Sequence, residues 1–256
     1  MQNNRCKEMQ PLLLIHGIIS DGSFFDKIKE ELCDEFEVFT YDRIGYGNSS
    51  FDYKEAKDEY TVSSQADQAY NVIKDLRRPA WIVGNSAGGL IAIELALKYP
   101  NAVAGMILLE PSLAFDEKTT DELIEWNRLL NSFKNEKRIK KALPAFSEVI
   151  GNTDNHEPTS LLEMKKTYKN LENFMYGELN DIQNYRPSLS QLKQIDFPVY
   201  IGISQDGAGS IFARSSIESS YKIEWPIVYF PGYHNTLKDY PKEGAAIIKN
   251  IIMDKE

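Results

Sequence analysis

The stretch WIVGNSAGGL, residues 81–90, places a single serine where an apolar run gives way to a helical pattern. The run ends at Gly84, and Ser86 has glycine two residues before it and two residues after it. A sharp strand-to-helix turn strains the backbone at the serine, and side chains at the two flanking positions would collide there. The turn presents the hydroxyl at a helix N-terminus, which favours developing negative charge. The pattern predicts a nucleophile at Ser86; the alternative is a serine that only caps the helix.

The organisation of the chain around this stretch predicts an α/β fold. Short apolar runs alternate with helical patterns up to residue 111, and the alternation returns after residue 190. Such alternation is typical of a mostly parallel sheet with helices on both faces, and uninterrupted apolar strands agree with burial on both sides. We expect strands over residues 11–17, 36–42, 80–84, 103–111, 197–204 and 225–230.

Residues 112–190 interrupt the alternation with charged helical patterns that contain no convincing strand. We therefore expect a core domain built from residues 1–111 and 191–256, with a helical cap inserted at 112–190. Long insertions in compact domains often act as lids over a site. Most apolar side chains of the cap are expected to pack its helices, and the remainder to line a pocket for an apolar acyl or alkyl group.

The composition narrows the class of protein. The 256 residues, 42% of them hydrophobic, are enough for one sizeable core. A net charge of −9 argues against a nucleic-acid partner, which needs a basic surface. The first ten residues lack the apolar segment of a signal peptide, and no run approaches the ~20 apolar residues that span a bilayer. We expect a cytoplasmic protein without membrane insertion, and, because no metal-ligand cluster or phosphate loop is visible, no cofactor and no metal.

The choice of a base for Ser86 is limited, because the chain contains three histidines. A serine hydroxyl needs a histidine base, and the histidine needs a carboxylate to orient it. His16 ends the first apolar run, His156 lies in a polar turn of the cap, and His234 follows the last expected strand. Loops after the carboxyl ends of parallel strands share one edge of the sheet, which is the edge of Ser86. We expect His234 to be the base; the alternative is a histidine that caps the final helix.

Two carboxylates follow strands at the same edge. Asp206 lies just past the strand over 197–204, in a loop that glycines 207 and 209 allow to bend. Glu110 ends the strand that follows the helix after Ser86. We expect Asp206 to orient the histidine, and we keep Glu110 as the alternative acid. Glu110 is the second choice because an acid before a proline can have the purely structural role of holding the base of the cap.

Several motifs, in order along the chain, resemble those of the α/β-hydrolase superfamily in its capped, single-domain form. The resemblance covers nearly the whole chain. LLLIHGIIS (12–20) is similar to the family's loop after an early strand, and YDRIGYGNS (41–49) to its D-x-x-G-x-G-x-S segment. GNSAGG (84–89) matches the nucleophile turn, and FPVYIGISQD (197–206) and GYH (232–234) match the acid and histidine loops.

The resemblance implies roles for further residues. The family's chain order of serine, acid and histidine is matched by Ser86, Asp206 and His234. It also implies an oxyanion hole made by two backbone N–H groups, those of Ala87 and Ile18. Backbone donors suit this task because their positions are fixed before charge develops.

Other matched residues are expected to be structural. His16 would hold the shape of its loop, and Asp42 and Arg43 would shape a turn beside the site. The family usually has a β-hairpin before the first matched strand, but only ten residues precede Pro11. We therefore expect about six strands, with a sheet edge left open to pairing, and the protein to be a monomer or a homodimer.

These observations together predict a serine esterase. The expected reaction is hydrolysis of carboxylic esters of a small to medium, partly apolar small-molecule substrate through an acyl-enzyme. Two alternatives stay open, because a fold does not fix a function. The same triad could perform C–C bond hydrolysis or a pyruvyl elimination of the menaquinone-pathway type. The protein could also be a non-catalytic ligand receptor on a hydrolase fold.

Overall fold

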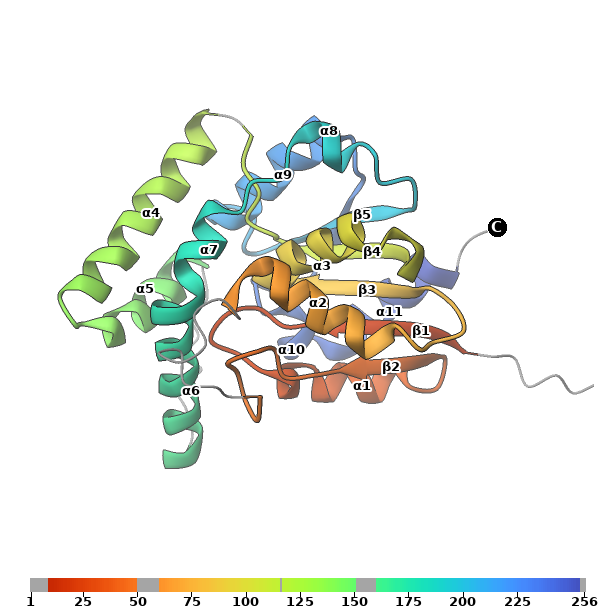
Figure 1. Ribbon diagram of the computed structural model, residues 1–256, viewed down its shortest axis with the longest axis horizontal. Coiled ribbons are helices and arrows are strands. Elements are labelled where there is room, and N and C mark those ends of the chain that lie inside the picture. The colour runs from red at the N-terminus through yellow and green to blue at the C-terminus, as the bar shows by residue number, and fades with distance from the viewer. Residues whose placement is uncertain (1–8, 50–59, 116, 151–159, 254–256) are drawn as a thin grey trace, which may run out of the picture.

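The computed structural model describes residues 9–49, 60–115, 117–150 and 160–253, and within them one sheet of six parallel strands (Figure 1). The strand order is β2-β1-β3-β4-β5-β6. This sheet and its flanking helices confirm the predicted fold class. The strands are β1 (Gln10–Ile15), β2 (Phe36–Thr40), β3 (Ala80–Asn85), β4 (Val103–Leu109), β5 (Val199–Ser204) and β6 (Ile227–Phe230).

The strand order reverses beside β1. The chain passes from β1 outward to β2 and then returns to β3 on the other side of β1. Ile15 of β1 lies opposite Gly84 of β3, so these two strands end side by side. In an open parallel sheet, ligands bind outside the carboxyl ends of the strands at such a point of reversal. Gly17 and Ser86 follow the two strand ends directly, which places both residues where a ligand would bind.

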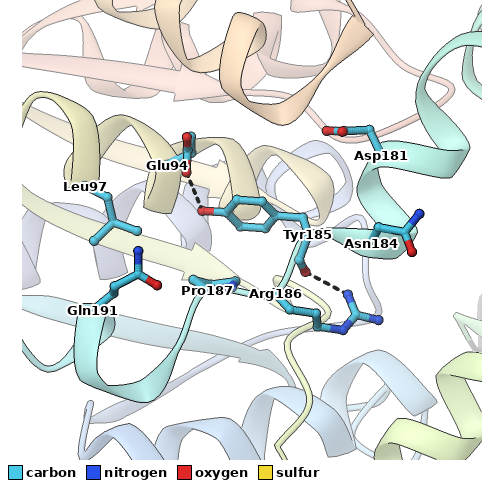
Figure 2. Close-up of a pocket in the computed structure, with 8 residues that line it drawn as sticks. All are labelled: Glu94, Leu97, Asp181, Asn184, Tyr185, Arg186, Pro187 and Gln191. Atoms are coloured by element: carbon cyan, nitrogen blue, oxygen red, sulfur yellow. Dashed lines mark hydrogen bonds between the residues drawn. The ribbon is translucent and has the colours of Figure 1, made fainter.

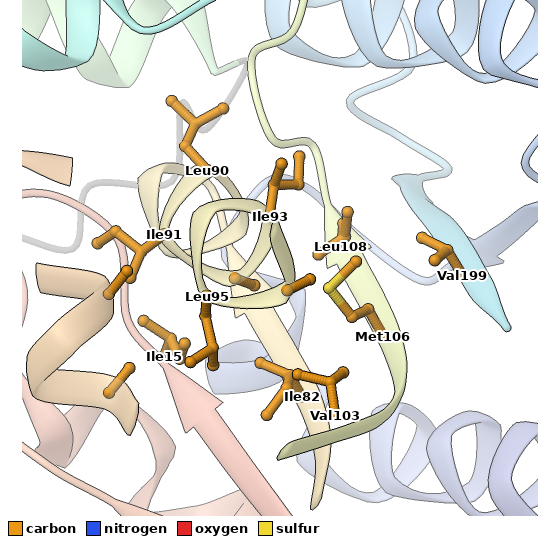
Figure 3. Close-up of a cluster of buried hydrophobic side chains, with 14 of the residues drawn as sticks. Ile15, Ile82, Leu90, Ile91, Ile93, Leu95, Val103, Met106, Leu108 and Val199 are labelled. Carbon is orange, nitrogen blue, oxygen red and sulfur yellow. The ribbon is translucent and has the colours of Figure 1, made fainter. Parts of the chain in front are cut away.

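Helices cover both faces of the sheet, and each face has its own apolar core. The helices of the first face are α2 (Val62–Ile73), α3 (Ala87–Lys98) and α9 (Ile211–Ile223). Those of the second face are α1 (Asp26–Leu32), α10 (Thr236–Asp239) and α11 (Pro241–Met253). Figure 3 shows Leu90, Ile91, Ile93 and Leu95 of α3 pointing in different directions around the helix, and all four belong to the buried cluster of this face. Burial around most of its circumference holds the start of α3 firmly against β1 and β3.

Residues 112–190, which we call the insertion, lie between β4 and β5, and their described parts consist of helices joined by turns and loops. Its helices are α4 (Glu117–Asn135), α5 (Ala142–Val149), α6 (Leu161–Asn173) and α7 (Leu179–Asn184), and α8 (Leu189–Leu192) begins at its end. A π-helical turn, Phe174–Glu178, joins α6 to α7. Helices α4 to α7 gather beyond the carboxyl ends of the strands (Figure 1). The insertion therefore lies over the end of the sheet that carries Ser86.

A lipid bilayer sets a minimum length and apolar content for any helix that crosses it. A spanning helix needs ~20 predominantly apolar residues. None of the helices within 9–49, 60–115, 117–150 and 160–253 is both long enough and apolar enough to cross a membrane.

Candidate active site

Ser86 occupies a sharp turn between β3 and α3. Its backbone has φ 55° and ψ −124°, a conformation that side-chain-bearing residues rarely adopt. Its N–H donates to the carbonyl oxygen of Leu109 at 2.8 Å, and its carbonyl oxygen accepts from the N–H of Gly89 at 2.8 Å. A Cβ atom at Gly84 would lie 2.6 Å from the carbonyl oxygen of Gly88, across the turn. Such strain persists only where the surrounding structure enforces it, and it is typical of functional residues.

The imidazole of His234 is bound by a carboxylate, and that carboxylate belongs to Glu110. Nδ1 of His234 contacts Oε2 of Glu110 in a short hydrogen bond, and the two side chains are almost completely buried. Glu110 directly follows β4, and its φ of 45° turns the chain sharply there. Its N–H donates to the carbonyl oxygen of Gly202 at 3.1 Å, which ties this turn to β5. The structure thus brings together His234 and the alternative acid of the sequence analysis.

The expectation that Asp206 orients His234 is corrected by this geometry. The side chain of Asp206 is exposed, and its N–H donates to the carbonyl oxygen of Gly232 at 2.9 Å. The physical reason lies at the end of β5, where Ser204 occupies the space beside Glu110. Asp206 lies two residues further along, in a loop that turns its carboxylate toward solvent.

Ser204 fixes the carboxylate of Glu110 in place. Both the N–H of Ser204, at 2.9 Å, and its hydroxyl donate to Oε1 of Glu110. Burial alone would raise the pKa of Glu110, but the hydrogen bond and charge of His234, together with the bonds from Ser204, hold that pKa below its ordinary value. Glu110 is therefore ionised at neutral pH and accepts bonds at both oxygens. Sequence reasoning missed Ser204, because a serine at the end of an apolar strand carries no motif.

Replacing Ser204 by alanine should destabilise the protein in a pH-dependent way. A hydrogen bond to a charged group contributes about 1.5–3 kcal/mol, so Ser204→Ala should lower the free energy of unfolding by that amount at neutral pH. The folded-state pKa of Glu110 is depressed, so its bonds contribute stability above the ordinary glutamate pKa and lose it as pH falls through the folded-state pKa. Urea unfolding at a series of pH values should show the difference from the wild type shrinking on acidification.

Ser215→Ala is the matched control for this measurement. The hydroxyl of Ser215 is also buried, but it donates to an uncharged acceptor, the carbonyl oxygen of Phe212, at 3.0 Å. Its loss should cost about 1 kcal/mol at every pH. Equal pH dependence in the two variants would contradict the assignment of Ser204 to the charged form of Glu110.

The first loop after β1 lies against Ser86. A Cβ atom at Gly17 would lie 3.1 Å from Cβ of Ser86, which measures how closely the two segments approach. Ile18 follows Gly17, and Ala87 is the first residue of α3. Both line the same cavity as Ser86 and His234. The two residues expected to supply oxyanion donors are therefore brought to one cavity with the candidate nucleophile and base.

The cavity between the insertion and the sheet has a volume of about 900 Å³. Its walls are largely apolar, and the insertion supplies most of the apolar side chains, among them Leu123, Trp126, Leu130, Phe146, Phe174 and Ile182. Charged side chains are fewer: Lys140, Glu148, Glu163, Arg186 and Lys238. A cavity of this size and lining suits a ligand with a substantial apolar part. Within the described parts of the chain, no three His, Cys, Asp or Glu side chains are grouped as a metal ion would require.

A second, smaller hollow of about 290 Å³ lies where the insertion meets α3 (Figure 2). Tyr185 points toward α3, and its hydroxyl donates to Oε2 of Glu94 at 3.0 Å. Neither Ser86 nor His234 lines this hollow. The Tyr185–Glu94 bond is thus a contact between insertion and core that lies apart from the candidate catalytic residues.

The comparisons with known proteins agree with one family. The sequence profile of the alpha/beta hydrolase fold matches residues 10–237. The chain is 27% identical over 243 residues to the uncharacterized hydrolase YraK of Bacillus subtilis, across 91% of this chain and 84% of that protein. It is 32% identical over 104 residues to a pimeloyl-[acyl-carrier protein] methyl ester esterase of Yersinia pseudotuberculosis, across 41% of this chain and 37% of that one. A thermophilic esterase from Thermogutta terrifontis has the same fold, with a TM-score of 0.73 at 20% identity over 95% of this chain and 89% of that structure.

Proposed function

Since this chain belongs to the α/β-hydrolase fold family, we propose that it is a serine hydrolase that cleaves carboxylic esters through an acyl-enzyme. The observation that carries the proposal is the buried His234–Glu110 pair, which lies at the same cavity as the strained Ser86. A serine held in this way, with a histidine whose far nitrogen is bound by a carboxylate, has the parts that activate a hydroxyl.

The reaction proceeds in two half-reactions. His234 takes the proton of Ser86 as the hydroxyl attacks the ester carbonyl, and it then donates that proton to the leaving alkoxide. Water, deprotonated by His234, attacks the acyl-enzyme and releases the acid. Glu110 keeps the proton of His234 on Nδ1 and stabilises the imidazolium. The N–H groups of Ile18 and Ala87 bind the oxyanion in both half-reactions.

The shape and lining of the cavity indicate the substrate class. A volume of about 900 Å³ with mostly apolar walls favours an ester of small to medium size with an apolar acyl or alkyl group. The names of two similar proteins, an esterase from Thermogutta terrifontis and a methyl ester esterase from Yersinia pseudotuberculosis, support ester hydrolysis as the chemistry. In this proposal the insertion, residues 112–190, acts as the cap of a core domain formed by residues 1–111 and 191–256.

Labelling with a fluorophosphonate probe tests the proposal. The probe reacts with activated serines, so mass spectrometry of the intact protein should show one adduct, and peptide mapping should place it on Ser86. Ser112 lines the same cavity and should stay unmodified, which makes it an internal control. The adduct should be absent from Ser86→Ala and His234→Ala.

A panel of p-nitrophenyl esters with acyl chains of increasing length should then show turnover by the labelled site. Wild-type protein that is folded but gains no adduct and hydrolyses none of these esters would contradict the proposed function. It would favour the ligand-receptor alternative instead.

A further inference from the structure

A fully buried ion pair joins the insertion to the core close to Ser86. The guanidinium of Arg43 contacts both carboxylate oxygens of Glu178, and neither side chain has any exposed surface. Glu178 is the last residue of the π-helical turn between α6 and α7, and Arg43 lies in the loop after β2. Two further core side chains, Tyr46 through its hydroxyl and Gln65 through Nε2 at 3.2 Å, donate to the same carboxylate.

The stability of the fold alone does not explain this pair. Removing two charges from water is costly, and replacing a buried ion pair by apolar residues is often neutral or stabilising. Burial by itself would lower the pKa of Arg43, but the carboxylate of Glu178 outweighs burial and raises that pKa above its ordinary value. Arg43 therefore stays charged in the interior. A permanent buried charge suggests a task for the guanidinium beyond holding two segments together.

That task is visible at the carbonyl oxygen of Gly17. Nη2 of Arg43 donates to it at 3.0 Å, and Nδ1 of His16 donates to it at 2.8 Å. Burial and the charge of Arg43 lower the pKa of His16 well below its ordinary value, so this imidazole is neutral. Its Nε2 accepts from the N–H of Arg43 at 3.1 Å, which leaves the proton on Nδ1. The Gly17 carbonyl thus has both of its lone pairs occupied by buried donors.

Fixing this carbonyl also fixes the donor that follows it. The carbonyl of Gly17 and the N–H of Ile18 belong to one planar peptide group, in which they point in opposite directions. Arg43 and His16 hold the carbonyl on one side, so the N–H of Ile18 is held on the other. A charged donor on the carbonyl also polarises the peptide group and strengthens the N–H as a donor.

We propose that Arg43 and Glu178 are positioning residues for the oxyanion hole. Glu178 of the insertion holds Arg43, Arg43 holds the Gly17 carbonyl, and the Ile18 N–H is thereby aimed at the oxyanion. This inference rests on the proposed function, because it assigns Ile18 an oxyanion to bind. Its consequence is that the insertion takes part in transition-state stabilisation as well as in enclosing the substrate.

The kinetics of two variants, Arg43→Lys and Glu178→Gln, on a soluble p-nitrophenyl ester test this role. Loss of one oxyanion donor costs about 10²–10³ in rate, so loosening one should lower kcat by about 10- to 100-fold. We expect this fall in kcat in both Arg43→Lys and Glu178→Gln. A lysine has one ammonium group in place of the planar guanidinium, so it cannot reach Glu178 and the Gly17 carbonyl together. KM should stay within about threefold, because the donor acts on the transition state. The acidic limb of the pH profile of kcat/KM should not move, since His234 and Glu110 are untouched.

Tyr185→Phe is the matched control, because it removes a different hydrogen bond between the insertion and the core, that to Glu94. Its kcat should equal that of the wild type. An equal fall of kcat in Tyr185→Phe, or an unchanged kcat in Glu178→Gln, would overturn the positioning role while leaving the proposed function intact. A wild type that neither turns over the ester nor labels at Ser86 would overturn both.

Tyr46→Phe provides a second test if a variant of the ion pair does not fold. It removes one donor from the Glu178 carboxylate and leaves both charges in place. A smaller fall of kcat, about 3- to 10-fold with KM unchanged, supports the role. A kcat equal to that of the wild type counts against it.

Discussion

Glu110→Gln should lower kcat by about 10⁴-fold, the loss seen when the triad carboxylate of a serine protease becomes an amide. Asp206→Asn should leave kcat within about twofold of the wild type, because its side chain is exposed to solvent. The two substitutions are chemically equivalent, each exchanging a carboxylate for the matching amide. The difference between the kcat values of the two variants therefore shows which of the two residues is the acid.

The large effect at Glu110 follows from the orientation that a glutamine must adopt there. The N–H and hydroxyl of Ser204 both point at the Oε1 position, so the amide oxygen of Gln would take that place. The amide nitrogen would then face Nδ1 of His234, where the carboxylate now accepts. A donor there forces the proton of the imidazole onto its other nitrogen, Nε2. In that tautomer His234 can no longer take the proton of Ser86.

Steady-state kinetics on an aryl ester, with urea unfolding to show that both variants are folded, would measure these effects. A large fall of kcat in Asp206→Asn together with near-normal activity in Glu110→Gln would show that Asp206 is the acid, as expected from the sequence. It would also mean that the loop after β5 rearranges when substrate binds.

The sequence could not decide between these acids, because the two strands that precede them are neighbours in a parallel sheet. Glu110 directly follows β4 and Asp206 lies two residues past β5, so strand periodicity places both at the same edge. The direction of each side chain decides instead. That direction depends on the φ of 45° at Glu110 and on the packing of Ser204. Neither feature can be predicted from the spacing of hydrophobic residues in the sequence.

Other parts of the structure were predictable because their signals are local. The six strands follow from short apolar runs, and the turn at Ser86 follows from five adjacent residues. The Arg43–Glu178 pair had no such signal, since its members are 135 residues apart in the chain. Glu178 was one acid among many in a charged helical pattern. Only the packing of the insertion onto the loop after β2 shows that its charge is buried.

Gly88→Ala should lower the free energy of unfolding by about 3 kcal/mol or more, at the top of the range for overpacked cores. The sequence pattern predicts that glycine is needed here because of the turn itself, but at Gly88 the constraint comes from the neighbouring strand, β1. A Cβ atom there would lie 2.8 Å from the carbonyl carbon of Ile15, at the end of β1, and closer still to its oxygen. These are backbone atoms, which no change of rotamer can move away.

The same substitution should also reduce activity in any fraction that folds. Relieving the clash requires α3 to move away from β1, and the two proposed oxyanion donors lie on either side of that contact, Ala87 on α3 and Ile18 after β1. Gly209→Ala is the control, because a Cβ atom at Gly209 meets nothing within 4 Å and its loss of stability should stay within about 0.5 kcal/mol. Urea unfolding and ester hydrolysis of both variants measure the two effects. Equal stability of the two variants would mean that β1 and α3 can separate freely, and the oxyanion hole would then lack the rigid frame on which the mechanism depends.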